Sequence, residues 1–195
     1  MSSQAIEVVE LFRQTGAYLS GHFLLTSGLH SAAYLQCARV LQHPEHAAAL
    51  GGRLAEALRH LAPEASVVVS PAMGGLIIGH EVARTLGVRH IFTERGDDRK
   101  MMLRRGFAVE PGERAVVVED VITTGVSTRE VIDLLRANGA EVLAAGSIID
   151  RSGGAADVSV PRAALATLSV ETWKPEDCPL CRQGVPAVKP GSRPS

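Results

Sequence analysis

The sequence predicts an α/β fold in which a parallel, twisted sheet is covered by helices on both faces. Four short apolar segments, at residues 67–70, 88–93, 114–120 and 141–150, lack the alternating pattern of a half-exposed strand. Segments with helical spacing lie between several of them, and turn residues mark their ends. Strands that alternate with helices in this way are typical of a parallel sheet buried on both sides.

The N-terminal part of the chain precedes this pattern. Residues 5–14 have the apolar spacing of an amphipathic helix, which Gly16 is expected to end. Residues 17–37 predict short strands around a turn at residues 27–28. Pro44 occupies a first helical position, and leucines at helical spacing follow it.

The central part continues with predicted helices over residues 76–86 and 127–137, ended by glycine or by Asn-Gly. Residues 94–112 are polar and are expected to lie outside the sheet. The chain as a whole predicts one domain over residues 1–175, with a core at about 64–150. Residues 176–195 are rich in Pro, Gly and charge, which predicts a loose C-terminal tail.

Composition excludes several classes of function. The 195 residues carry a formal net charge of -1 and are only 4% aromatic, which argues against a protein that coats nucleic acid through a strongly basic surface. No segment is long and apolar enough to span a bilayer, and the N-terminus lacks the pattern of a signal peptide. Three cysteines, an odd number, argue against a disulfide framework. We therefore expect a cytoplasmic protein without nucleic-acid or membrane partners.

The most informative segment is residues 116–128, in which an apolar strand ends in the adjacent acids Glu119 and Asp120. A Thr-Thr-Gly loop and a helix follow, and Ser127 with Glu130 matches a capping box at the helix start. A helix N-terminus of this kind can bind a phosphate closely, whereas the two acids suit a sugar diol or a cation. The pattern thus indicates a phosphorylated ribose with magnesium; the alternative is an ordinary turn with solvated acids.

This segment resembles the 5-phosphoribosyl-1-diphosphate (PRPP) binding motif of type I phosphoribosyltransferases. The resemblance implies that fold, with a small N-terminal hood at about residues 17–37 over the carboxyl edge of the sheet. It also implies that Glu119 and Asp120 hold the ribose hydroxyls and take part in catalysis. The loop that would enclose the 5-phosphate comprises Val121, Ile122, Thr123, Thr124, Gly125, Val126 and Ser127.

Three further segments resemble the orotate phosphoribosyltransferases: residues 21–34 in the hood, residues 70–75 as a diphosphate loop, and the pair Asp150-Arg151 after a strand. A guanidinium at Arg151 can hold the carboxylate or a ring carbonyl of orotate; the alternative is a surface ion pair with Asp150. The hood segment alone would also fit a plain hairpin turn. The resemblance implies these orotate-binding residues: Thr123, Arg151, Ser27 and Gly28.

The polar segment at residues 95–106 resembles the mobile loop that closes over the diphosphate, often in the partner subunit of a homodimer. Arg95 is expected to bind PRPP, and Arg99 and Lys100 to act in catalysis. In the diphosphate loop, Met73 and Gly74 are expected to contact PRPP.

The sequence departs from the family's usual pattern in its basic residues. Thr26 stands where many members have lysine before the hood Ser-Gly, and the diphosphate loop has no lysine. Asp98 stands opposite the usual catalytic lysine and Lys100 opposite the usual histidine. The resemblance therefore does not assign the catalytic role to one loop residue. It does imply a non-proline cis peptide between Ala72 and Met73.

The segment Cys178-Pro-Leu-Cys181 is a single C-x-x-C. A structural zinc site needs about four ligands, and no second pair stands at ligand spacing. A turn in the tail is therefore the expected reading, with redox or zinc use as the alternative. His22 and His30 flank the hood turn and are interpreted as local hydrogen-bonding residues rather than metal ligands.

Taken together, the resemblance implies transfer of the 5-phosphoribosyl group from PRPP to orotate, in de novo synthesis of UMP. It implies Mg²⁺ held mainly by PRPP, with no assigned protein ligand, and a homodimer whose loop 95–106 reaches the neighbouring site. Two alternatives share the PRPP motif. One is a purine-type phosphoribosyltransferase, which should lack the hood and the Asp-Arg pair. The other is a non-enzymatic PRPP-sensing regulator, which would need a basic face or an added DNA-binding module.

Overall fold

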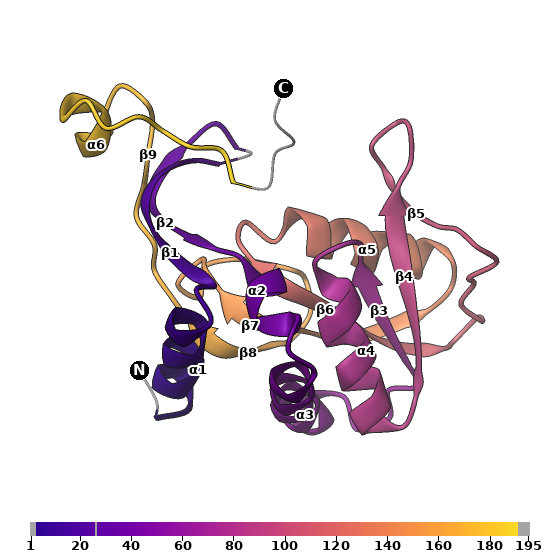
Figure 1. Cartoon of the computed structure of the whole chain (residues 1–195). Helices are drawn as coiled ribbons and strands as arrows, with labels where there is room; N and C mark the ends of the chain where they lie inside the picture. Colours follow the sequence, from indigo (N-terminus) through magenta and orange to yellow (C-terminus); the bar gives the residue numbers. More distant parts are fainter. Residues whose placement is uncertain (1–2, 26, 191–195) are drawn as a thin grey trace.

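The computed structural model describes residues 3–25 and 27–190, which form six helices and two sheets (Figure 1). The helices are α1 (Ser3–Gln14), α2 (Cys37–Leu41), α3 (Pro44–Leu61), α4 (Gly75–Leu86), α5 (Val126–Ala137) and α6 (Pro179–Arg182). Within this part of the chain, no helix combines the length and apolar character needed to cross a membrane.

The larger sheet has six strands in the order β5-β4-β3-β6-β7-β8. Their bounds are β3 (Val67–Pro71), β4 (Arg89–Arg95), β5 (Met101–Leu103), β6 (Arg114–Ile122), β7 (Glu141–Asp150) and β8 (Arg162–Thr167). All are parallel except β5, which folds back antiparallel on β4. The carboxyl ends of β3, β6 and β7 therefore meet at one edge, where ligands bind in open α/β sheets.

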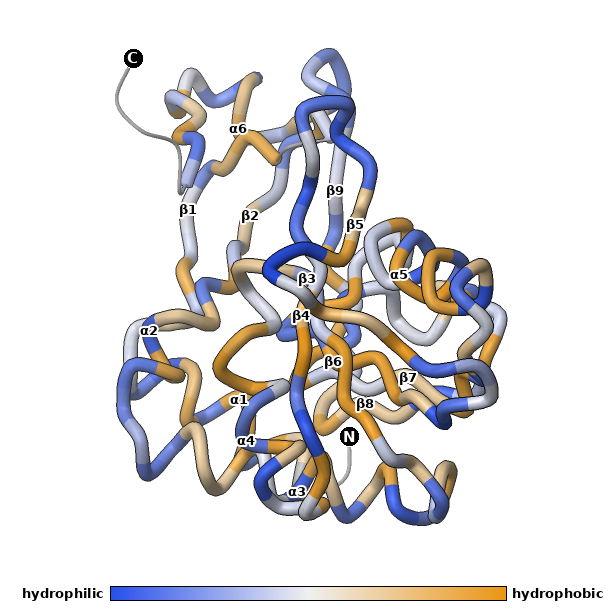
Figure 2. The backbone as a smooth tube through the Cα atoms, turned by 90° about the vertical axis from the view of Figure 1, so that its right-hand side faces the viewer, coloured by the Kyte–Doolittle hydropathy of each residue, from blue (hydrophilic) through white to orange (hydrophobic). Residues whose placement is uncertain are grey.

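Helices cover both faces of this sheet, as predicted. Val116 and Val118 of β6 pack into a core formed with α1, α3 and α4, whereas Ala115 and Val117 pack into a second core with α5. Both faces are thus buried, which explains why β6 shows no apolar alternation. Along the tube of Figure 2, apolar colour is concentrated in these central strands.

The smaller sheet is the hood. It has the order β1-β2-β9, formed by β1 (Tyr18–Leu24), β2 (His30–Leu35) and β9 (Thr172–Trp173), all antiparallel. The hood therefore combines the N-terminal segment with a strand close to the C-terminus, and Figure 1 shows it above the main sheet with α6 beside it.

The C-terminal segment differs from the predicted loose tail. Its last described part returns to the hood, where the Val188 N–H donates to the His22 carbonyl at 2.8 Å and the Leu24 N–H donates to the Val188 carbonyl at 2.9 Å. The hood thus extends beyond the predicted residues 17–37. Residues 191–195 of the predicted tail, and Thr26 before the hood turn, lie outside the described residues.

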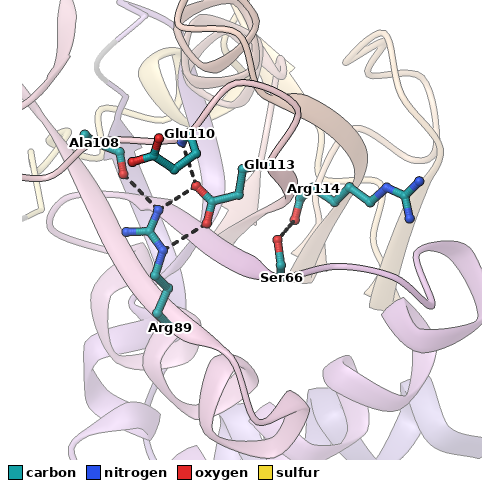
Figure 3. A network of polar contacts seen from close by, with 6 residues as sticks. All are labelled: Ser66, Arg89, Ala108, Glu110, Glu113 and Arg114. Carbon is teal, nitrogen blue, oxygen red and sulfur yellow. Dashed lines mark hydrogen bonds and ion pairs between the residues drawn. The ribbon is translucent and has the colours of Figure 1, made fainter.

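A polar network holds the opposite, amino-terminal edge of the sheet (Figure 3). Arg89 at the start of β4 pairs with Glu113 through two contacts, Nε to Oε1 at 3.0 Å and Nη2 to Oε2 at 2.6 Å. The same guanidinium donates to the Ala108 carbonyl at 2.8 Å, and the Glu110 N–H donates to Glu113 at 2.9 Å. Ser66 joins β3 to β6 by donating to the Arg114 carbonyl at 3.2 Å. The chain that returns from β5 is thereby fastened to the sheet.

Most predicted elements are confirmed, with three corrections. Part of the segment expected outside the sheet belongs to it, because β5 pairs with β4 in the register Arg95↔Met101. The strand β8 was not predicted. The capping box is absent: α5 begins at Val126 with no side-chain cap, and Glu130 pairs with Arg95 at 2.7 Å instead of reaching back to the helix start.

Candidate active site

A cavity of about 690 Å³ lies between the hood and the carboxyl edge of the main sheet. Three parts of the chain form it: the hood, the end of β6 with the following loop, and the segment just after β7. The lining residues are Leu25, Ser27, Leu29, Tyr34, Leu35, Glu119, Asp120, Val121, Thr123, Thr124, Ser127, Arg151, Val170 and Thr172. The predicted phosphate loop and the predicted base-binding residue thus face the same space.

Glu119 and Asp120 end the buried part of β6 and are themselves partly buried. The pKa of Glu119 is raised to about 7, mainly by burial and also by the neighbouring Asp120. The Thr128 hydroxyl, which donates a hydrogen bond to the Glu119 carboxylate, acts in the opposite direction. Burial also raises the pKa of Asp120, although the Val121 N–H donates to its Oδ1 at 2.9 Å. Burial of these two adjacent carboxyls therefore costs folding free energy when they are ionised. Carboxyl groups with raised pKa values are common at sites where acids bind a ligand or act in catalysis.

The loop after β6 leads directly into α5. Gly125 has φ of +78°, in the left-handed region, and a Cβ there would lie 2.9 Å from Cγ1 of Val158. Glycine therefore lets the chain turn sharply into the helix. Because α5 has no side-chain cap, its first N–H groups stay available, and with the positive end of the helix dipole they suit a phosphate.

Arg151 follows β7 beside this loop. Register places Ile122 opposite Asp150, so Thr123 and Arg151 leave the sheet as neighbours, and the Arg151 N–H donates to the Ile122 carbonyl at 2.8 Å. Burial lowers the pKa of the Arg151 guanidinium. The predicted alternative, an ion pair between Arg151 and Asp150, is wrong, because Asp150 pairs with Arg162 of β8.

The hood supplies the third wall. Ser27 lines the cavity, as predicted, and Gly28 follows it at the turn with φ of +82°. Tyr34 was not singled out, although it belongs to the hood segment that carried the resemblance. Its phenol lies among charged groups of both kinds: burial raises its pKa, Asp120 raises it further and Arg151 lowers it.

The predicted diphosphate-loop residues Met73 and Gly74 are not among the described residues that line the cavity; Gly74 packs against Asp120, and Met73 is exposed. The Ala72–Met73 peptide bond is cis, which confirms that prediction. Gly74 packs so closely on β6 that a Cβ would lie 2.6 Å from Oδ1 of Asp120. The close approach requires glycine, because any side chain would displace the carboxylate or the loop.

The predicted loop residues are divided between two places. Arg95 lies at the end of β4, where its Nη2 is 2.7 Å from Glu130 and 3.5 Å from Oγ of Ser127, at the start of α5. Arg99 and Lys100 lie at the exposed turn between β4 and β5, and neither is among the described residues that line the cavity. The structure therefore does not bring these two into their own chain's cavity.

Sequence reasoning missed several lining residues besides Tyr34. They are apolar or small residues of the hood and of the approach to β9: Leu25, Leu35, Val170 and Thr172. None carries a chemical signal of its own. The antiparallel pairing of β2 with β9, which brings Thr172 to the cavity, joins segments 140 residues apart and has no local signature.

The arrangement has separate regions for two kinds of ligand group. Two carboxylates and an uncapped helix start can hold a phosphorylated sugar, and the half-buried guanidinium of Arg151, which leaves the sheet next to Thr123, can hold an anionic group. The hood forms one wall of this space.

Comparison with known proteins identifies the family of the chain. Residues 36–174 match the model of the phosphoribosyl transferase domain family. The chain is 57% identical to an orotate phosphoribosyltransferase of Pelotomaculum thermopropionicum over 187 residues, which cover 96% of this chain and 97% of that protein. It is 52% identical to the orotate phosphoribosyltransferase of Thermotoga maritima over 186 residues, which cover 95% and 98%.

Solved structures give the same picture of the fold. The crystal structure of orotate phosphoribosyltransferase from Aeropyrum pernix superposes with a TM-score of 0.68 at 29% identity, covering 83% of this chain and 93% of that one. An adenine phosphoribosyltransferase from Thermoanaerobacter pseudethanolicus superposes with a TM-score of 0.60 at 18% identity, covering 70% and 88%, and shares the fold alone.

Proposed function

The chain belongs to the orotate phosphoribosyltransferases, a family of type I phosphoribosyltransferases. We propose that it requires Mg²⁺ for its reaction and that it acts as a homodimer. It transfers the 5-phosphoribosyl group from PRPP to orotate, giving orotidine 5-phosphate and diphosphate in pyrimidine synthesis. The observation that carries the residue assignments below is the shared cavity of Glu119, Asp120, Ser127 and Arg151. The purine-type and regulator alternatives have no comparable support.

In our assignment, the 5-phosphate binds the residues from Val121 to Ser127, where the N–H groups at the start of α5 meet it. Arg95, which is paired with Glu130, lies near enough to donate a hydrogen bond there, because its guanidinium is 3.5 Å from Oγ of Ser127. Glu119 and Asp120 accept hydrogen bonds from the ribose hydroxyls. This fixes the ribose so that its anomeric carbon faces the base side of the cavity.

Orotate binds on the opposite side, with its carboxylate or a ring carbonyl on Arg151 and a further contact from Thr123. Ser27 and Gly28 cover the ring from the hood. Substitution at the anomeric carbon then proceeds through a transition state with oxocarbenium character. Positioning and charge stabilisation contribute most of the rate, since orotate can lose its ring proton before it attacks.

Magnesium fits the donors present. Glu119 and Asp120 both line the cavity and offer carboxylate oxygens, which Mg²⁺ prefers. When bound, the ion would supply positive charge that stabilises the diphosphate as it leaves. The protein residues would hold it chiefly through PRPP.

A direct assay tests this function. Loss of orotate absorbance is followed with PRPP and Mg²⁺, with hypoxanthine, guanine and uracil as parallel bases. We expect consumption of orotate alone, abolished by EDTA and restored by added Mg²⁺. Turnover of a purine would refute the assignment of Arg151 and the hood to orotate binding. Full activity in EDTA would refute the requirement for Mg²⁺.

The homodimer is proposed from the placement of the loop. Arg99 and Lys100 lie outside their own chain's cavity at an exposed hairpin tip, so a neighbouring subunit is the place where they can act. Exposed apolar side chains of Met73 and Ile77, four residues apart at the start of α4, offer a surface for association.

Complementation distinguishes a loop that acts across the dimer from one that acts within a chain. One variant carries Arg99→Ala and Lys100→Ala, and the other carries Asp120→Asn. Each is expected to be nearly inactive. After unfolding and refolding together, mixed dimers should regain activity, because one of their two sites is intact. No recovery from a mixture shown to contain mixed dimers would refute action across the interface.

A further inference from the structure

Four metal-binding side chains converge between the hood and the C-terminal segment. His22 comes from β1, His30 from β2, and Cys178 and Cys181 from the start and the body of α6. One donor atom of each lies within 4.8 Å of the donor atoms of the others. This cluster lies outside the residues that line the active-site cavity, and the reaction makes no use of it.

We propose that these four residues bind one structural Zn²⁺ ion, which joins the C-terminal segment to the hood. The pattern that sequence analysis interpreted as an isolated C-x-x-C thus acquires its second pair of ligands from the opposite end of the chain. His22 and His30 do form hydrogen bonds, as predicted, and the proposal gives them a second role as metal ligands.

The distances suit a tetrahedral site. Zinc bonds of about 2.0–2.1 Å to nitrogen and 2.3 Å to sulfur place neighbouring donors roughly 3.3–3.8 Å apart. Nε2 of His22 lies 3.4 Å from Sγ of Cys178 and 3.9 Å from Sγ of Cys181. Nδ1 of His30 lies 3.2 Å from Sγ of Cys181 and 2.8 Å from Nε2 of His22. Small rotations of the imidazoles would bring all four donors to bonding distance from one centre.

The hydrogen bonding of His22 prepares it as a ligand. Its Nδ1 lies 2.7 Å from the Val185 carbonyl, which can only accept, so Nδ1 carries the proton. The lone pair of Nε2 then points at the other three donor atoms. A carbonyl that fixes the tautomer of a ligating histidine in this way is the usual second partner in zinc sites.

The chemistry of the donors favours zinc over other ions. Two thiolates with two imidazoles in a tetrahedral arrangement are a zinc set, whereas magnesium and calcium take oxygen ligands. Four protein ligands also leave no open position for water, which is the arrangement of a structural site rather than a catalytic one. His22, His30 and Cys178 are buried, so the ion would be held in a largely closed site.

The hood is a part of the molecule that such an ion would stabilise. Its sheet consists of two short strands and the two-residue β9, and the sequence between β9 and Val188 contains only the four-residue helix α6. Small units with little core commonly depend on metals or disulfides. The ion would connect β1, β2 and α6, which come from both ends of the chain.

Metal analysis of the full-length wild-type chain tests the proposal without relying on a variant. After purification with a thiol reductant and gel filtration, we expect one zinc per chain by elemental analysis. Titration of the thiols with an organomercurial should release it, and EDTA treatment should lower the Tm by at least about 5 °C. Replacement by Co²⁺ should give the intense visible bands and thiolate charge-transfer absorption of a tetrahedral site.

Variants then assign the ligands. Cys181→Ser and His30→Ala should lose the zinc and the cobalt spectrum, whereas Cys37→Ser and the exposed His60→Ala should keep both. Wild-type protein with no bound zinc and no tetrahedral cobalt spectrum would overturn the proposal. So would a disulfide between Cys178 and Cys181 in the reduced preparation, or zinc retained in Cys181→Ser.

Discussion

Replacing Glu119 with glutamine should make the protein more stable above neutral pH while it removes most of the activity. Burial raises the pKa of this carboxyl from an ordinary 4.5 to about 7. A carboxyl whose pKa is raised by folding stabilises the protein below the unfolded pKa, and that contribution is lost as pH rises through the folded pKa. Between about pH 5 and pH 8 the wild-type protein therefore bears an increasing cost that the neutral glutamine avoids.

The size of this effect follows from the two pKa values. Their difference corresponds to about 3 kcal/mol at full ionisation, and the partial exposure of Glu119 reduces it to about 2 kcal/mol. For a chain of 195 residues this is a gain in Tm of roughly 4–8 °C at pH 8. The amide oxygen of glutamine can still accept the hydrogen bond from Thr128, so the packing is largely preserved.

Thermal unfolding of both proteins from pH 5 to pH 8 is the assay, and Glu110→Gln, a change at an exposed position, is the control. The Tm difference should be small at pH 5 and grow towards pH 8 for Glu119→Gln only. In parallel, kcat/KM for PRPP of the wild-type enzyme should fall as pH drops through about 7, because the ribose hydroxyls need the ionised carboxylate. A Tm difference that does not change with pH would refute the burial argument, and near-normal turnover by Glu119→Gln would refute the ribose assignment.

Three further substitutions probe the site and its support. Arg151→Ala should raise the KM for orotate by about 10²-fold, with a much smaller change for PRPP, and equal effects in steady-state kinetics would indicate a structural role instead. Gly74→Ala should lower kcat/KM for PRPP at least about tenfold, because the new Cβ would lie 2.6 Å from Oδ1 of Asp120; an unchanged value would show that the loop yields freely. Arg162→Ala should destabilise the protein by about 3–5 kcal/mol in denaturant unfolding, because the buried carboxylate of Asp150 loses its ion pair, and a loss below about 1 kcal/mol would contradict this.

The parts of the fold that sequence reasoning predicted are those with a local physical signal. The strands β3, β6 and β7 contain continuous apolar runs because both faces of the sheet are buried there. Gly87 ends α4 with φ of +75°, where a glycine avoids the strain of a side chain. The phosphate loop was predicted for the same reason, since its acids, hydroxyls and glycine are consecutive in sequence.

Errors arose where a distant residue overrode a local pattern. Ser127 and Glu130 have capping-box spacing, yet Glu130 pairs with Arg95, which is 35 residues earlier in the chain. The guanidinium gives this carboxylate a charged partner, while the helix start keeps its N–H groups free. A phosphate site gains from both changes, so the local rule failed at a position where ligand binding and helix capping compete for the same donors.

The residues of the phosphate side of the cavity are close together in sequence, whereas those of the base side are far apart. This difference limits what the sequence reveals about the choice of base. The phosphate side comes from one continuous segment, so its ligand can be inferred from spacing. The base side combines Ser27 and Tyr34 of the hood with Arg151 after β7 and Thr172 of β9, and the pairing of β2 with β9 brings Thr172 to the hood. Recognition of the base therefore depends on how the two ends of the chain are joined, which is also where the four proposed zinc ligands lie. A change at those ligands would alter the base side of the site first, although none of them touches the cavity.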